Sequence, residues 1–313
     1  MTMAVSRVVV TPVYEDVEAS SRLFRELRTA LGPDIFIVAV DDGSVRQPVS
    51  ADAISSAGLN GVVLRLKRNV GHQRAIATGL AYVAEHLPQA LCVVMDSDGE
   101  DLPSSIPALF ERLEADSIDI AVAQRKSRVE SMRFKAFYAV YKLLFQWLTG
   151  HTISFGNFMA MKPAAVRRLA VMPETGIHIA GTVLISKLRL AICPLDRGPR
   201  YAGKSKMNFT GLVLHGFRAM MILAEDVLLR TGLMCVAIAA LSIMAIVLIV
   251  LLKAFGLATP GWFSVALGIL LLVLFQTGAL TLMMLMLTGV VRGGSPIAPD
   301  YKLLVDCVLE AHA

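Results

Sequence analysis

The sequence predicts an α/β domain with a mainly parallel sheet, followed by amphipathic interfacial helices and a two-helix transmembrane hairpin. Three observations support this fold class. From residue 7 to 125, short runs of β-branched residues alternate with segments whose apolar residues recur at helical spacing. Polar residues stand at the ends of several of these runs. Two long stretches without charge then occupy most of 232–291. Alternating strands and helices are typical of a parallel sheet, and about 20 apolar residues can span a bilayer.

The elements of the α/β domain follow one another closely along the chain. We expect strands at 7–11, 35–40, 61–66, 91–95, 118–123 and 190–195, and helices at 16–31, from 69–74 to about 86, and 103–113. Ligands of such sheets bind beyond the carboxyl ends of the strands. The polar residues at these ends are Pro12, Tyr14, Asp16, Asp41, Asp42, Asp96, Asp98, Glu100 and Arg125.

The composition excludes an ordinary soluble protein. Of the 313 residues 55% are hydrophobic, and the mean hydropathy is +0.62, whereas soluble domains are about 45–50% apolar. The net charge is +5, with basic clusters at 125–142 and 197–206. These clusters favour anionic substrates or a membrane surface, and no nucleic acid is expected. The four cysteines show no metal or disulfide spacing, which fits a reducing compartment, and the N-terminus has no signal-peptide pattern.

An acidic cluster follows the predicted strand 91–95. Four carboxylates, Asp96, Asp98, Glu100 and Asp101, fall within six residues. Because like charges repel, a hard cation with oxygen ligands is expected among them, and Mg²⁺ or Mn²⁺ on Asp96, Asp98 and Glu100 is the corresponding prediction. The alternative is a solvated acidic turn in which Asp101 caps the next helix.

Two amphipathic helices precede the apolar stretches. Within 130–149 an aromatic stripe recurs at helical spacing. Its members are Phe134, Phe137, Tyr138, Tyr141, Phe145 and Leu148, flanked by Arg128, Arg133, Lys135 and Lys142. A core helix would also show such a stripe, but the basic flanks favour an interfacial helix. A second amphipathic helix is expected over 208–229, so that residues 1–207 form the α/β domain and 208–230 a juxtamembrane helix.

The transmembrane hairpin is predicted to span 231–253 and 262–291. Lys253 should mark the end of a span, because a lysine at the bilayer centre costs about 2.5–3.5 kcal/mol. Arginines and lysines flank the outer ends of the hairpin, so the positive-inside rule places the α/β domain, both termini and the tail 292–313 in the cytoplasm. The expected location is therefore the inner (cytoplasmic) membrane, crossed twice.

The stretch from Gly198 to Ser205 matches the P-loop pattern letter by letter. After Ser205 only an amphipathic helix and the hairpin remain, so no later strand can supply the second Asp of a P-loop site. We therefore reject that interpretation. The basic residues Arg197, Arg200, Lys204 and Lys206 suit phosphate binding without the P-loop fold.

Taken together, these motifs resemble those of the family-two glycosyltransferases, and in particular the polyprenyl-phosphate sugar synthases. The resemblance covers about residues 6–207, and the hairpin matches the architecture of the bacterial members. The motifs are Pro12-Val-Tyr-Glu-Asp16, Asp41-Asp-Gly-Ser44, Asp96-Ser-Asp-Gly-Glu-Asp-Leu-Pro103, Ala123-Gln-Arg125 and Arg200-Tyr-Ala-Gly-Lys-Ser-Lys206. The sequence departs from the family at several positions: Glu15 stands for Asn, Asp16 for Glu, Glu100 for Gln, and Ala123-Gln124 for Gly-Ser.

The resemblance implies a GT-A type domain that moves one sugar, with inversion, from a UDP- or GDP-linked donor to an undecaprenyl-type polyprenyl phosphate. It implies a catalytic role for Asp98, and Asp42 would read the base. The acceptor is a dianionic phosphate that needs cations rather than a base, and these would be Arg133, Arg200 and Lys206. Further substrate contacts are implied for Pro12, Tyr14, Asp16, Asp41, Asp96, Ser97, Arg125, Arg128 and Ser205. A homo-oligomer is left open.

Two other functions compete with this one. A processive polysaccharide synthase would carry Gln-x-x-Arg-Trp on an interfacial helix, but Gln146-Trp147 lacks the arginine and the spacing. A non-catalytic, membrane-anchored nucleotide-binding protein is the second alternative. The intact Asp96, Asp98 and Arg200 argue against it.

Overall fold

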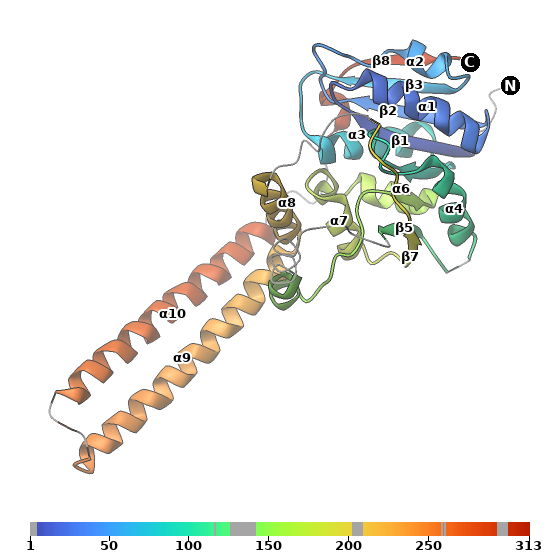
Figure 1. The fold of residues 1–313 in the computed structure, drawn as a ribbon. Helices are drawn as coiled ribbons and strands as arrows, with labels where there is room; N and C mark the ends of the chain where they lie inside the picture. Colours follow the sequence, from blue (N-terminus) through green and yellow to red (C-terminus); the bar gives the residue numbers. More distant parts are fainter. Residues whose placement is uncertain are drawn as a thin grey trace. The chain divides into compact units, whose positions relative to one another are not determined.

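The computed structural model describes residues 5–115, 117–125, 142–201, 209–257, 259, 261–292 and 300–313, with only the backbone at 125, 209–215 and 292. It divides into two units (Figure 1): Met1–Met132, Ile153–Ile222 and Ser295–Ala313 form one, and Arg133–Thr152 with Leu223–Gly294 the other. The elements are β1 Arg7–Val13, α1 Val17–Leu31, β2 Ile35–Asp41, α2 Ala51–Ser55, β3 Asn60–Leu66, α3 His72–His86, β4 Leu91–Val94, η1 Pro103–Ser105, α4 Ile106–Glu114, β5 Ile120–Arg125, β6 Met159–Met161, α6 Pro163–Ala170, η2 Pro173–Gly176, α7 Ile179–Ile185, β7 Leu190–Leu195, α8 Phe209–Ile222, α9 Ala224–Ala254, α10 Trp262–Arg292, η3 Tyr301–Leu303 and β8 Val305–Ala311.

The first unit is built on one eight-stranded sheet with the order β7-β5-β6-β4-β1-β2-β3-β8. Strands β1 to β4 pair in parallel, and so do β5 and β7. Only β6 and β8 run antiparallel to their neighbours. The predicted α/β domain with a mainly parallel sheet is therefore confirmed.

Successive residues of β1 serve two different cores. Val8 and Val10 pack in the core that contains Ile76 and Leu80 of α3, whereas Val9 and Val13 pack with Leu23, Phe24 and Leu27 of α1. Both faces of the sheet are thus covered, which explains why its strands read as continuous apolar runs rather than alternating ones. Each fully buried aliphatic or aromatic side chain contributes about 1.5–3 kcal/mol relative to exposure.

Two turns at the carboxyl ends of β1 and β2 position the later site. The carboxylate of Asp16 accepts a hydrogen bond from Ala19 N at 3.3 Å and caps α1. Gly43 has a φ of +69°, and a Cβ at this position would lie 2.4 Å from the carbonyl carbon of Arg68. Glycine is needed at 43 both for the left-handed backbone and for the close approach of the loop that leads into α3.

The C-terminal segment returns to the sheet, which the sequence pattern did not predict. Strand β8 pairs antiparallel with β3, with Leu309 opposite Val63. Its residues alternate between partly buried and exposed positions up to Ala311, which is buried. The tail 292–313 thus supplies an edge strand to the domain from which the chain departed.

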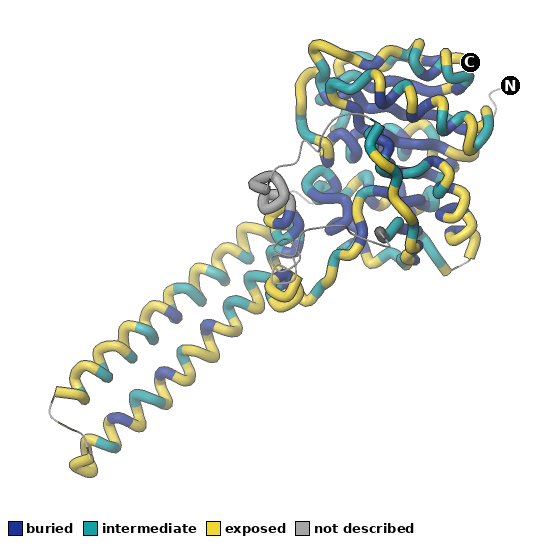
Figure 2. The backbone as a smooth tube through the Cα atoms, viewed as in Figure 1, coloured by how far each residue is buried: buried dark blue, intermediate teal, exposed yellow. Residues whose placement is uncertain are grey.

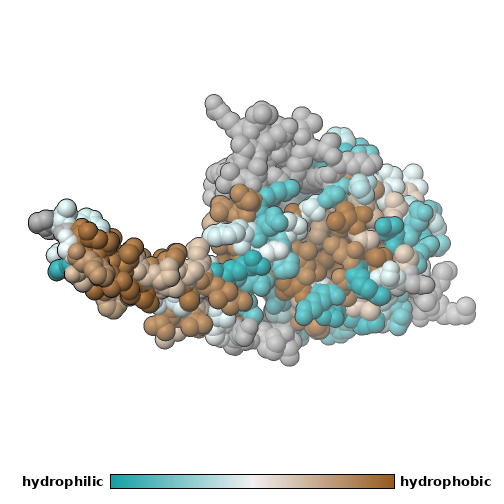
Figure 3. Space-filling view, turned by 90° about the horizontal axis from the view of Figure 1, so that it is seen from below, coloured by the Kyte–Doolittle hydropathy of each residue, from teal (hydrophilic) through white to brown (hydrophobic). Residues whose placement is uncertain are grey.

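The second unit contains two helices of 31 residues, α9 and α10, each long and apolar enough to cross a membrane. Their side chains are mostly exposed (Figure 2) and hydrophobic (Figure 3). Lys253 lies in the last turn of α9, as predicted, with Nζ 3.9 Å from the Phe263 ring centroid. The single helix expected over 208–229 is wrong: α8 ends at Ile222 and α9 begins at Ala224.

Residues 142–149 of the second unit are helical. Phe145 of the predicted stripe is buried and Leu148 is partly buried, while Leu143, Leu144 and Trp147 are exposed. The carbonyl oxygen of Trp147 accepts a hydrogen bond from Arg230 of α9 at 3.5 Å. The remainder of the predicted interfacial helix lies outside the described residues.

Candidate functional site

A cavity of about 270 Å³ opens where β1 and β2 end and α3 begins. Its lining comes from three segments that are far apart in sequence: Pro12, Val13 and Tyr14, then Asp42, and then Asn69, Gly71 and His72. The structure therefore brings together Pro12, Tyr14 and Asp42, which the sequence placed at the ends of different strands. Tyr14 is 44% exposed, so its ring is accessible to a flat ligand.

The two aspartates after β2 hold loops in place. Asp41 is fully buried, and its carboxylate accepts hydrogen bonds from Ser44 N and Val49 N, both at 2.9 Å. Asp42 accepts from Val70 N at 2.7 Å and from Gly71 N at 3.0 Å. Burial raises the pKa of Asp42 more than these N–H donors lower it. Asp41 thus braces its own loop, while Asp42 ties this loop to the start of α3 at the cavity wall.

Glu15 closes the loop after β1 in a strained conformation. Its φ is +48°, which is unusual for a residue with a Cβ. The carboxylate accepts hydrogen bonds from the backbone N–H groups of Val45, Arg46 and Gln47. These hydrogen bonds lower the pKa of Glu15, and the bond from Val45 N has the largest effect. At two of the positions where the sequence departs from the family, Glu15 therefore binds a neighbouring loop and Asp16 caps α1.

The acidic loop after β4 is paired with two arginines. Arg200 Nη2 lies 2.9 Å from Asp98 Oδ2, and Arg200 Nε lies 2.9 Å from Glu100 Oε1. Arg197 contacts the other oxygen of Glu100. Ser97 is partly exposed in the same loop. The sequence placed Arg200 in a different motif from Asp98 and Glu100, and the fold brings them into direct contact.

Asp101 does not cap the helix that follows. Its Oδ2 accepts a hydrogen bond from Asp96 N at 3.1 Å, and no side chain caps η1. Burial, reinforced by the charge of Asp96, raises the pKa of Asp101 to about 7. The alternative of a solvated, helix-capping acidic turn is therefore wrong.

His72 connects the cavity to the acidic loop through a chain of hydrogen bonds. Ile179 N donates to Gln73 Oε1 at 2.7 Å, which fixes the orientation of that amide. Gln73 Nε2 then donates to Asn157 Oδ1 at 3.2 Å, and Asn157 Nδ2 lies 2.9 Å from His72 Nε2. Gln73 and Asn157 carried no signal in the sequence.

Asp96 lies next to this histidine. Its Oδ1 is 3.1 Å from His72 Nε2, but the oxygen is buried and no described group donates a well-aligned hydrogen bond to it. Burial raises the pKa of Asp96, but the nearby His72 and Arg197 lower it more, so that the net shift is downward. The carboxylate is thus ionised, with this oxygen beside His72 Nε2.

These groups fit a divalent cation, although among the described residues no three His, Cys, Asp or Glu side chains form a ready ligand set. Mg²⁺ and Mn²⁺ take oxygen ligands, and Mg²⁺ sites commonly use one or two carboxylates plus substrate phosphates. Asp96 offers a buried oxygen beside His72, and Asp98 and Glu100 offer oxygens now bonded to arginines. The three carboxylates of this loop are therefore more than the one or two that such a site needs alongside substrate phosphates.

The remaining predicted residues cannot be placed as fully. Arg125 ends β5 and pairs with Leu195 of β7 through the backbone. Arg128, Arg133, Ser205 and Lys206 lie outside the described residues.

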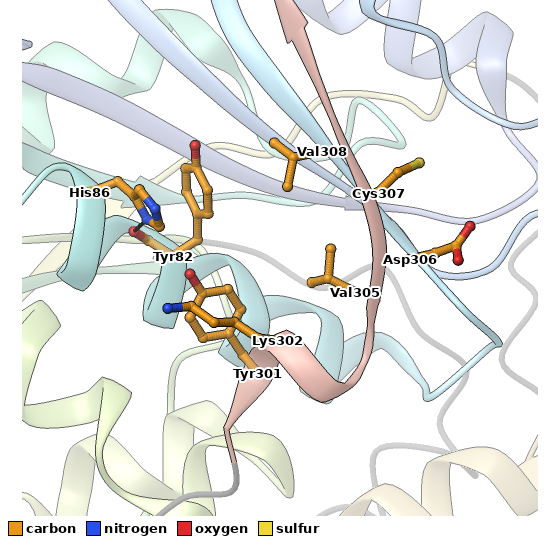
Figure 4. A pocket seen from close by; sticks show the side chains of 8 residues that line it. All are labelled: Tyr82, His86, Tyr301, Lys302, Val305, Asp306, Cys307 and Val308. Atoms are coloured by element: carbon orange, nitrogen blue, oxygen red, sulfur yellow. Dashed lines mark hydrogen bonds between the residues drawn. The ribbon is translucent and has the colours of Figure 1, made fainter.

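A second cavity, of about 340 Å³, lies near the other end of α3. Figure 4 shows Tyr82, His86, Tyr301 and Lys302 opposite Val305 and Val308 of β8. A helix rises 1.5 Å per residue, so the 15 residues of α3 place this cavity about 20 Å from His72. None of the residues predicted for the site lines it.

Comparison with known proteins agrees with this geometry. Residues 8–169 match the model of glycosyl transferase family 2. The undecaprenyl-phosphate 4-deoxy-4-formamido-L-arabinose transferase of Enterobacter sp. (strain 638) is 30% identical over 279 residues, which cover 86% of this chain and 82% of that protein. Glucosyl-3-phosphoglycerate synthase of Mycobacterium tuberculosis, in a crystal structure with Mn²⁺, UDP-glucose and phosphoglyceric acid, shares the fold with a TM-score of 0.50 at 16% identity, covering 72% of this chain and 79% of that chain. The chain belongs to glycosyl transferase family 2 and is a glycosyltransferase of the GT-A fold.

Proposed function

We propose that this glycosyltransferase transfers one sugar from a nucleotide sugar to a polyprenyl phosphate, with a divalent metal and with inversion at the anomeric carbon. The main support is that Arg197 and Arg200 form ion pairs with the acidic loop, close to the cavity that His72 lines. The lipid class follows from the name of the 30% identical relative. The nucleotide-sugar class is consistent with the ligands of the solved structure of similar fold.

In this proposal the donor lies in the 270 Å³ cavity. Tyr14 and Pro12 would contact the nucleoside, and Asp42 would read the base while its loop is held by Asp41. The N-terminus of α3 points N–H groups and the positive end of the helix dipole toward the diphosphate. Asp16 and Ser97 would contribute from the adjoining loops.

Asp96, Asp98 and Glu100 would hold Mg²⁺ or Mn²⁺, which supplies positive charge to the leaving diphosphate. For Asp98 Oδ2 and Glu100 Oε1 to serve as ligands, Arg200 would have to release these two oxygens. Release would leave a free guanidinium beside the donor. A guanidinium is well suited to bind a second phosphate in a bidentate manner.

The acceptor would be a lipid phosphate held by Arg200 together with Arg125, Arg128, Arg133, Ser205 and Lys206. A phosphate oxygen forms a bond to the anomeric carbon on the face opposite the leaving group, and the bond from that carbon to the diphosphate oxygen breaks with its electron pair. The products are a polyprenyl-phosphate sugar and a nucleoside diphosphate. Because a phosphate monoester is largely dianionic at pH 7, the attack needs no general base.

The hairpin would anchor the enzyme in the inner membrane, with its active site on the cytoplasmic side. The chain leaves the α/β domain after α8 and returns to the same sheet as β8. Two crossings by α9 and α10 would therefore leave both termini on the side of the catalytic domain. The exposed Leu143, Leu144 and Trp147 suit an interfacial position for the helix at 142–149.

The proposal is tested by incubating membranes that contain the protein with labelled UDP- and GDP-sugars, undecaprenyl phosphate and Mn²⁺ or Mg²⁺. We expect one sugar per lipid. Polymer chains would instead indicate a processive synthase, and no transfer from any donor would indicate a non-catalytic protein.

A further inference from the structure

The segment Arg197–Tyr201 lies along the acidic loop and is bound to its backbone. Gly198 N donates a hydrogen bond to Glu100 O at 3.0 Å, and Tyr201 N donates to Asp98 O at 2.9 Å. These two bonds enclose Arg200, whose side chain meets Asp98 and Glu100. A group that holds the end of this segment therefore also determines where the guanidinium of Arg200 can lie.

The ring of Tyr201 is such a group, because it packs directly over Gly99. Gly99 has a φ of +85°, and a Cβ there would lie 2.6 Å from Cδ1 of Tyr201. The ring thus occupies the space that any other residue at 99 would need. Tyr201 and Gly99 are matched in shape at the centre of the acidic loop.

The hydroxyl of Tyr201 then ties this loop to α1. It donates to Glu26 Oε2 at 2.6 Å, while the other oxygen of Glu26 accepts from Arg22 Nε at 3.0 Å. The guanidinium of Arg22 also lies 4.3 Å from the centroid of the Tyr201 ring. Hydrogen bonds to a carboxylate are about twice as strong as those between neutral groups. Burial, with the charge of Glu26, raises the pKa of Tyr201, so the hydroxyl remains a donor.

We propose that Tyr201 is a positioning residue, which places Arg200 for the acceptor phosphate by binding Glu26 of α1 and covering Gly99. The inference rests on the proposed function, in which Arg200 meets the acceptor phosphate. Since a displacement of about 1 Å can cost a hundredfold in rate, loss of one anchor should affect the acceptor step. It should leave the donor cavity, which Tyr201 does not line, unaffected.

The first test compares Tyr201→Phe with Tyr301→Phe. Tyr301 donates a similar hydrogen bond, at 2.8 Å, to Glu85 at the far end of α3, and its ring appears in Figure 4. Each substitution removes one hydroxyl that donates to a glutamate, so the loss of stability should be similar. We expect kcat/KM for undecaprenyl phosphate to fall about tenfold in Tyr201→Phe, with binding of UDP changed less than about twofold. Tyr301→Phe should retain the wild-type kcat/KM.

The second test examines whether Tyr201 acts through Glu26. Glu26→Ala and Tyr201→Phe should each cause a similar loss, and the double variant should be no worse than either alone. Glu26→Gln keeps an acceptor oxygen and should recover most of the loss. An equal kcat/KM in Tyr201→Phe and Tyr301→Phe, or a defect confined to donor binding, would overturn the inference.

A third measurement does not depend on activity. Hydrogen exchange at the amides of 197–201 should be faster in Tyr201→Phe than in the wild type, whereas in Tyr301→Phe it should not change. If the wild type transfers no sugar to any lipid phosphate, the proposed function fails, but faster exchange would still support anchoring of Arg200 by Tyr201. Unchanged exchange would refute that anchoring.

Discussion

Nη2 of Arg200 lies 2.9 Å from Oδ2 of Asp98, so a residue implied to bind the acceptor is in direct contact with a residue implied to bind the metal. The same guanidinium reaches Glu100, whose second oxygen contacts Arg197. A guanidinium and a divalent cation compete for the same carboxylate oxygens. The binding of metal with its donor should therefore release Arg200, and this release links donor binding to the formation of the acceptor site.

Arg200→Gln should accordingly increase the affinity for Mn²⁺ in the absence of donor. Removing a positive charge a few ångströms from the carboxylates should lower the Kd about tenfold, since exposed and partly buried charges interact by about 1 kcal/mol or more at such distances. Electron paramagnetic resonance of free Mn²⁺ measures this directly. Arg189→Gln, which removes an arginine paired with Asp119 just before β7 and β5, is the control and should leave the Kd unchanged. A weaker or equal affinity in Arg200→Gln would contradict the competition.

Asp96→Asn and Asp98→Ala should abolish metal-dependent transfer while the protein remains folded. Both carboxylates belong to the predicted metal site, and Asp96 holds the buried oxygen that no described donor satisfies. We expect transfer to fall by about a thousandfold or more, which corresponds to about 4 kcal/mol of transition-state stabilisation. Chelation with EDTA should have the same effect on the wild type, and added Mn²⁺ should restore the wild type alone. Near-normal turnover of either variant would remove its carboxylate from the proposed metal site.

The strand-end residues could be predicted because their positions follow from simple periodicity. Parallel strands place their carboxyl ends at one edge of the sheet, so Pro12, Asp42 and Asp96 had to lie near one another once the strands were recognised. The hairpin was equally predictable, because each of the two long uncharged stretches has the length and hydropathy that a bilayer crossing requires. Lys253 at the end of α9 followed from the cost of burying a charge in a bilayer.

Two strands and several loop contacts depend on tertiary pairing, and little in the sequence pattern indicates them. Strand β6 has three residues, Met159–Met161, and exists because β4 and β5 pair with it on both sides. Strand β8 pairs with β3, which lies far earlier in the chain, although the alternation in Val305–Ala311 could have suggested a strand. The contacts of Tyr201 and Asn157 depend on where loops meet, which no periodicity encodes.

Asn157→Ala should reduce transfer through its effect on His72. The amide of Asn157 joins Gln73 to His72 Nε2, so its loss should free the imidazole to turn. We expect kcat/KM for the donor to fall about tenfold, with His72→Ala causing a similar loss and the double variant little more, because residues acting as a unit are not additive. Steady-state kinetics at varied donor concentration measure this kcat/KM for the two single variants and the double variant. Full additivity would show that Asn157 and His72 act independently.

The ion pair between Asp119 and Arg189 should make stability depend on pH in the acid range. Arg189 binds both oxygens of Asp119, at 2.9 and 2.8 Å, and joins the starts of β5 and β7. This hydrogen bonding lowers the pKa of Asp119 to about 2 from its ordinary value of 3.8. A carboxyl group with a lowered pKa stabilises the folded state fully above the unfolded pKa, and the contribution is lost as the pH falls through the folded pKa.

Asp119→Asn should therefore lower the free energy of unfolding by about 1 kcal/mol at pH 7, a value reduced for the solvent screening of the exposed Arg189. The melting temperature of the detergent-solubilised protein should fall by about 2–4 °C. Because Asn cannot ionise, the difference from the wild type should stay constant from about pH 7 to 5 and shrink as the pH falls from about 4 toward 2. Asp34→Asn, at an exposed aspartate before β2, should show no such trend. A difference that persists undiminished at about pH 3 and below would mean that packing, rather than the charge of Asp119, joins these two strands.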